Sequence, residues 1–108
     1  MSLKQTQLEV DQWIKEHGVR YFNELTNMAI LTEEVGEVAR IIARRYGEQS
    51  EKESDKGKDL GEELADVIFV VMALANQTGI NLEEIWQKRM KEKAERDHKR
   101  HWDNNKLK

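Results

Sequence analysis

An all-α fold, built around an antiparallel four-helix bundle-like core, is predicted by three features of the sequence. Apolar residues recur at the helical spacing i, i+3, i+4, i+7 in four segments that cover most of the chain. The chain contains no proline, so long helices can run unbroken. Most connections between the segments are short, which favours antiparallel neighbours. With 108 residues, the chain is expected to form one domain, residues 1–108.

The first helix is expected at about residues 3–16. We expect Gly18 to end it, because glycine readily takes the left-handed conformation that closes helices. Trp13 belongs to the apolar stripe, so we expect it to pack in the core rather than stack on a ligand. The apolar side of this helix is formed by Leu3, Val10, Trp13 and Ile14.

The second helix is expected at about 24–46, with Asn23 as its N-cap and Gly47 just after its end. The third helix, at about 59–77, is the most apolar segment and is expected to be central. The main apolar stripe of the second helix is Met28, Leu31, Val35, Val38, Ala39, Ile42 and Tyr46. The stripe of the third helix is Leu60, Leu64, Val67, Val71, Leu74 and Ala75.

The fourth helix is expected at about 82–97, where Asn81 and Glu84 resemble a capping box. Residues 47–58 are charged and contain two glycines, which predicts a loop. The basic segment 98–108 is expected to fray. Five residues of the fourth helix are expected to face inward: Leu82, Ile85, Trp86, Met90 and Ala94.

Composition narrows the class of protein. No cysteine is present, so disulfides, thiolate metal sites and cysteine nucleophiles are excluded. A net charge of −3 disfavours nucleic acid as a partner. No apolar run approaches the roughly 20 residues of a membrane span, and the first residues lack a signal-peptide core, so we expect a cytoplasmic protein. With 38% apolar and 36% charged residues, the core is modest, and burial of further apolar area in a homo-oligomer is expected.

Carboxylates occupy an organised second face on the two most apolar helices. Glu34 and Glu37 lie three residues apart on the second helix, and Glu63 and Asp66 do so on the third. Apolar residues continue both rows. Glu33 and Glu62 flank the pairs and add negative charge. If the two helices pack antiparallel, four carboxylates can meet in one cluster.

Buried like charges repel, so this cluster requires a counter-charge. No lysine or arginine lies three or four residues after Glu63 or Asp66, and only Arg40 and Arg44 lie near the other pair. A cation from solvent is the simplest compensation, and carboxylate oxygens suit Mg²⁺, with Mn²⁺ as a substitute. A solvated acidic face is the ordinary alternative. The apolar neighbours and the presence of two such pairs favour the metal site.

The segments TEEVGEVAR and GEELADVIFVVMALANQTGI resemble the MazG-like family of all-α nucleoside triphosphate pyrophosphohydrolases. The resemblance rests on an EExxE motif at Glu33, Glu34 and Glu37, followed by an ExxD motif at Glu63 and Asp66, and it extends from the first helix to about residue 102. It implies Mg²⁺ bound by Glu34, Glu37, Glu63 and Asp66, and hydrolysis between the α- and β-phosphates. It also implies that the protein forms dimers or tetramers.

The resemblance further implies roles for residues outside the metal cluster. Glu33, Glu34 and Glu63 are the candidates for catalytic work on the attacking water. Asn76 and Lys93 resemble substrate-binding positions of relatives. The basic stretch that holds Lys93 and Arg96 is ordinarily a solvated face, and the functional alternative is that these two hold the pyrophosphate.

The expected function is therefore Mg²⁺-dependent cleavage of (d)NTP to (d)NMP and pyrophosphate, as housekeeping of the nucleotide pool. A non-catalytic helical module that binds a nucleotide or a protein is the alternative. A structural oligomer whose acidic pairs bind counter-ions is a third hypothesis.

Overall fold

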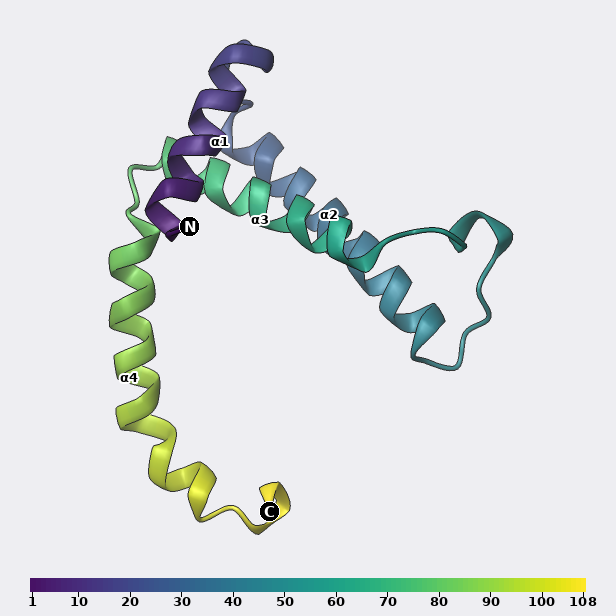
Figure 1. The fold of residues 1–108 in the computed structure, drawn as a ribbon, viewed down its shortest axis with the longest axis vertical. Helices are drawn as coiled ribbons and strands as arrows, with labels where there is room; N and C mark the ends of the chain where they lie inside the picture. The colour runs from purple at the N-terminus through teal and green to yellow at the C-terminus, as the bar shows by residue number, and fades with distance from the viewer.

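The computed structural model describes all 108 residues and contains four α-helices, two short 3-10 turns and no strand (Figure 1). The prediction of an all-α fold is confirmed. Most predicted boundaries are correct within two residues. The elements are α1 (Leu3–His17), α2 (Glu24–Arg45), η1 (Glu53–Asp55), α3 (Leu60–Gln77), α4 (Leu82–Trp102) and η2 (Asn105–Leu107).

The C-terminal part of α4 differs from the prediction, because the helix continues to Trp102 instead of fraying after residue 97. Its last turn carries Lys99, Arg100 and His101, whose charge complements the partial negative charge of a helix C-terminus. Asp97 also pairs with Arg96 at 2.8 Å, one turn before the end. These interactions support the additional turn.

Side-chain caps define the helix starts as predicted. The side chain of Asn23 accepts the backbone N–H of Thr26 at 2.8 Å, and that of Asn81 accepts the N–H of Glu84 at 3.3 Å. The end of α1 differs from the prediction. Gly18 is right-handed, with φ −99°, and the left-handed residue is Val19, with φ 69°. Glycine still suits this position, because a Cβ there would lie only 3.0 Å from the carbonyl oxygen of Ile14.

Helices α2 and α3 run side by side in opposite directions, and α1 crosses α3 near its C-terminal end (Figure 1). The core lies at this crossing and consists of Val10, Ile14, Met72 and Ala73. The buried side chain of Gln7 donates to the Asn76 side chain at 3.1 Å and to the Ile80 carbonyl at 2.9 Å. This amide therefore ties α1 to α3 and to the connection that follows it.

The face that α2 turns toward α3 is its acidic face. Ile41, on that face, is 4% exposed, and Glu34 is half-buried. Much of the main apolar stripe of α2 stays exposed: Val35 is 49% and Ile42 43% exposed. The carboxylates therefore lie at the helix–helix contact, and a large apolar face has no cover within one chain.

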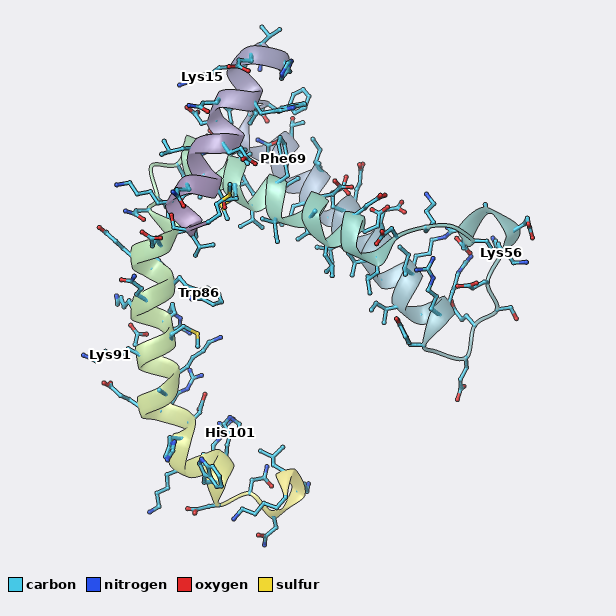
Figure 2. The ribbon with its side chains drawn as sticks, in the orientation of Figure 1. Lys15, Lys56, Phe69, Trp86, Lys91 and His101 are labelled. Carbon is cyan, nitrogen blue, oxygen red and sulfur yellow. The ribbon has the colours of Figure 1, made fainter.

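Helix α4 leaves the other helices across a bend of 108° from α3 (Figure 1). The prediction that its apolar stripe faces inward is wrong within a single chain, because none of its residues is buried. Leu82 alone packs on the core. Trp86 is 59% exposed and projects into the angle between α3 and α4, opposite Lys91 (Figure 2). No single helix is long and apolar enough to cross a membrane; α3 and α4 pass that test only as a bent pair.

The loop at 47–58 folds back on the end of α2. Asp55 is 4% exposed and accepts hydrogen bonds from Arg40 Nε at 2.7 Å, from Arg44 and from the Lys52 backbone N–H at 3.0 Å. Arg45 binds the carbonyl of Lys58. The bonds from the two arginines hold the pKa of Asp55 far below its usual 3.8. This charged segment is therefore tethered, which its composition did not predict.

Candidate metal centre

Three carboxylates predicted from the two motifs come together where α2 faces α3. Oxygen atoms of Glu34, Glu63 and Asp66 all lie within 4.8 Å of one another. The spacing of three residues places Glu63 and Asp66 on one side of α3, and the antiparallel packing brings Glu34 opposite them. Glu34 and Glu63 are half-buried, and Asp66 is exposed. The group is therefore accessible from solvent.

The charge of this cluster is not compensated by the protein. No ion pair in the structure includes any carboxylate of the two motifs. Arg40 and Arg44, the only basic residues near in sequence, bind Asp55 instead. Burial raises the pKa of Glu34, and repulsion from Asp66 and Glu63 raises it further. Three hard oxygen ligands with uncompensated charge fit a divalent cation such as Mg²⁺ or Mn²⁺.

Glu33 and Glu37 lie beside this cluster and outside it. Both are exposed, and neither contributes an oxygen to the group within 4.8 Å. Their charges still act on Glu34, whose pKa they help to raise. Glu37 as a fourth ligand and Glu33 as a catalytic group stay predictions.

A cavity of about 460 Å³ opens next to the cluster, and Glu34 and Asp66 form part of its wall. The rest of its lining is mostly apolar and comes from α1, the α1–α2 connection, α2 and α3. Trp13 and Phe69 meet edge to face with ring centroids 5.4 Å apart, and Figure 2 shows Phe69 on α3 beside α1. The residues that complete the wall are Ile14, Gly18, Arg20, Tyr21, Phe22, Asn27, Ile30, Val70 and Ala73.

The two tryptophans predicted to pack in the core do not do so. Trp13 is 50% exposed and lines the cavity, because its helix crosses α3 above the carboxylates. Trp86 is exposed because α4 leaves the other helices. The apolar spacing of α1 correctly placed Trp13 on the side that faces α3. It did not show that a cavity lies between the two helices there.

The three predicted substrate-binding residues lie away from the cluster within one chain. Asn76 is engaged with α1, since its side chain accepts from the Gln7 side chain and donates to the Gln7 carbonyl at 2.8 Å. Lys93 and Arg96 are exposed on α4, and Arg96 forms a bidentate pair with Asp97 at 2.9 and 2.8 Å. The substrate-binding roles of these residues stay predictions. Lys93 and Arg96 would need a second chain to bring them near the carboxylates of this one.

Asn27 and Phe69 are wall residues that sequence reasoning missed. Asn27 precedes Glu34 by seven residues, two helical turns, so the periodicity that identified the acidic face also places Asn27 on it. Phe69 follows Asp66 by three residues in the same way. Extending the acidic rows by one and two turns would have found both.

Comparisons with known proteins agree with the motifs and the fold. A family profile described as the MazG nucleotide pyrophosphohydrolase domain matches residues 22–102. Over 83 residues the chain is 42% identical to the "uncharacterized protein YpjD" of Bacillus subtilis strain 168. The aligned residues cover 77% of this chain and 75% of YpjD.

Two crystal structures are similar over most of the chain. That of YpjD from Bacillus subtilis, a proposed pyrophosphatase, has a TM-score of 0.78 and 42% identity, covering 90% of this chain and 97% of that chain. That of the Bacillus-conserved MazG protein, a nucleotide pyrophosphohydrolase, has a TM-score of 0.71 and 38% identity, covering 85% and 88%. The predicted resemblance is thus confirmed, and the chain belongs to the MazG nucleotide pyrophosphohydrolase family, a family of hydrolases that act on nucleotides.

Proposed function

We propose that this protein is a Mg²⁺-dependent enzyme that cleaves (d)NTP between the α- and β-phosphates, releasing (d)NMP and pyrophosphate. It acts as a single domain in the cytoplasm and limits or cleans the nucleotide pool. One observation carries the proposal: three uncompensated carboxylates converge beside an apolar cavity with aromatic walls. Triphosphate recognition requires such a cation site, because carboxylates alone repel phosphate.

Glu34, Glu63 and Asp66 would hold the metal, with Glu37 as a fourth ligand. A bound Mg²⁺ supplies charge neutralisation at the phosphates and lowers the pKa of a bound water. Burial and the neighbouring carboxylates raise the pKa of Glu34 in the metal-free cluster, and a bound cation would relieve that repulsion. Glu34 would then act both as a ligand and as a group that helps to orient the attacking water. Glu33, exposed beside the cluster, orients the attacking water, and Glu63 shares this work.

The cavity would hold the nucleoside. Its mostly apolar wall buries the base, and the exposed face of Trp13 offers a surface for stacking. Asn76 would contribute indirectly, because its bonds to Gln7 hold α1, and therefore Trp13, over the cavity.

We further propose that two copies form the working unit, as a dimer or within a tetramer. A compact monomer of this mass exposes roughly 6,200 Å², whereas this chain exposes 8585 Å². The excess, roughly 2,300 Å² per chain, is in the range that obligate homodimers bury. It includes the uncovered apolar faces of α2, α3 and α4, represented by Val35, Ile68 and Trp86. In this assembly α4 of one copy brings Lys93 and Arg96 to the phosphates held by the other.

The test is pyrophosphate release from a panel of NTPs and dNTPs, with Mg²⁺ and with EDTA, for the wild type and Glu63→Gln. Glu62→Gln, one residue away and outside the cluster, is the matched control. We expect metal-dependent release that Glu63→Gln abolishes and Glu62→Gln retains. Nucleotide binding without release by the folded protein would favour the binding module. A more stable Glu63→Gln variant with unchanged activity would favour a structural role for the acidic pairs.

A further inference from the structure

A buried polar side chain, Asn27, forms part of the cavity wall at a distance from the carboxylates. It is 6% exposed, and it lies on the same face of α2 as Glu34. Seven residues of α-helix separate the two, roughly 10 Å along the axis at 1.5 Å per residue. The cavity wall thus has carboxylates at one position and a second polar side chain about the length of a nucleoside away.

The orientation of the Asn27 amide is fixed by a backbone carbonyl. The Phe22 carbonyl oxygen accepts from Asn27 Nδ2 at 3.3 Å and from Gln77 Nε2 at 2.9 Å. Because a carbonyl oxygen can only accept, both amide nitrogens must face it. Gln77 Oε1 then accepts the other N–H of Asn27 at 2.8 Å.

Both donors of the Asn27 amide are therefore used inside the protein, and no protein group donates to its Oδ1. Asn27 can offer a ligand one thing, a hydrogen-bond acceptor. No fully buried side-chain oxygen in the structure lacks a partner, so Asn27 Oδ1 must reach accessible space. An accessible acceptor that the protein leaves unfilled, on a side chain that is otherwise buried, favours a ligand that supplies an N–H at that point and disfavours one that brings another oxygen.

We propose that Asn27 makes the cavity select bases that carry an amino group on the edge opposite the sugar, namely cytosine and adenine. This rests on the proposed function, in which the phosphates lie at the carboxylates. The base then points toward Asn27 with the group on C4 of a pyrimidine or C6 of a purine. Cytosine and adenine present an N–H₂ donor there, whereas uracil, thymine, guanine and hypoxanthine present a carbonyl oxygen.

Arg20, the basic residue on the wall, does not reverse this selection. Its side chain is exposed and donates to the carbonyl of the adjacent Tyr21 at 2.8 Å. Asn27 on the wall therefore selects a base that donates a hydrogen bond, and the enzyme acts on the amino-bearing bases cytosine and adenine rather than on their deaminated products.

The experiment compares two substrate pairs that differ at one group: dCTP with dUTP, and dATP with dITP. We expect kcat/KM to be at least about tenfold higher for the amino member of each pair. The amino group gains a hydrogen bond to Asn27 where the carbonyl oxygen is repelled, and a tenfold ratio corresponds to about 1.4 kcal/mol. Asn27→Leu should bring both ratios close to one. Glu62→Gln, which lies outside both the cluster and the cavity wall, is the control, and the preference should persist in it.

Binding of the products, measured by calorimetry with dCMP and dUMP, separates this inference from the proposed function. If no nucleotide is hydrolysed, the proposed function fails, and tighter binding of dCMP would still support the role of Asn27. Equal affinities and equal kcat/KM values in the wild type would overturn it, as would no binding of either product. A preference that survives in folded Asn27→Leu would also overturn it. Because the wild-type ratios decide alone, a variant that fails to fold does not block the test.

Discussion

Neutralising Glu34 should stabilise the metal-free protein and remove its response to Mg²⁺. Two unit charges 4.8 Å apart repel by about 0.9 kcal/mol in a water-like dielectric and by about 3.5 kcal/mol at an effective dielectric constant of 20. The cluster is open to solvent, so the lower value applies. Glu34 faces both Glu63 and Asp66, and Glu34→Gln therefore removes about 2 kcal/mol of repulsion.

The assay is thermal unfolding followed by circular dichroism, in EDTA and across a Mg²⁺ titration. In EDTA, Glu34→Gln should raise Tm by roughly 8 °C. The wild type should gain about 2.7 kcal/mol when Mg²⁺ reaches one hundred times its Kd, and the variant should gain much less. Glu33→Gln, exposed and outside the cluster, is the control that should change little. Equal Tm values in EDTA and equal Mg²⁺ responses for wild type and Glu34→Gln would refute the reasoning.

Three further predictions concern other parts of the molecule. The Tyr21 hydroxyl donates a hydrogen bond to Asp11, and burial together with this bond raises the pKa of Tyr21 from 10.0 to about 12. The protonated hydroxyl therefore stabilises the fold fully below pH 10, and this stabilisation is lost as the pH rises through 12. A tyrosinate absorbance titration of Tyr46→Phe, which leaves one tyrosine, checks this, and ionisation near pH 10 would contradict it. Asp55→Asn should speed amide hydrogen exchange across residues 47–58 at neutral pH. In the wild type, the bonds from Arg40 and Arg44 to the Asp55 carboxylate contribute fully above pH 3.8, and they are lost only as the pH falls through the much lower pKa of Asp55 in the folded protein. Trp86→Glu should shift the protein from dimer to monomer in light scattering, whereas Lys91→Glu, on the opposite side of α4, should not; unchanged mass for both would argue against the proposed assembly.

The bounds of most helices, and the positions of the carboxylates on them, could be predicted from local sequence. Caps such as Asn23 and the glycine after α1 act within a few residues of themselves, so one sequence suffices to place them. The meeting of Glu34 with Glu63 and Asp66 required only helical spacing and antiparallel packing. These are short-range rules, which explains why the motif residues were found.

What the sequence did not predict depends on long-range packing. The apolar stripe of α4 shows that a face is to be buried, but periodicity does not say by which chain. The burial of Asp55 depends on Arg40 and Arg44, fifteen and eleven residues before it, across a loop whose course no local rule fixes. Helical spacing places Asn27 on the acidic face, but the way its amide is oriented depends on Phe22 and Gln77, whose positions beside it no local rule gives.

The small number of buried residues has a consequence for how the protein unfolds. Of 108 residues, 10 are buried, and the core cluster of one chain holds four. In the proposed assembly the chain gains much of its folding free energy on association, so its unfolding midpoint should rise with protein concentration. Dilution alone would then weaken α4 first, because that helix has the least support from its own chain. The amount of enzyme in a cell would thus set how much of it is folded.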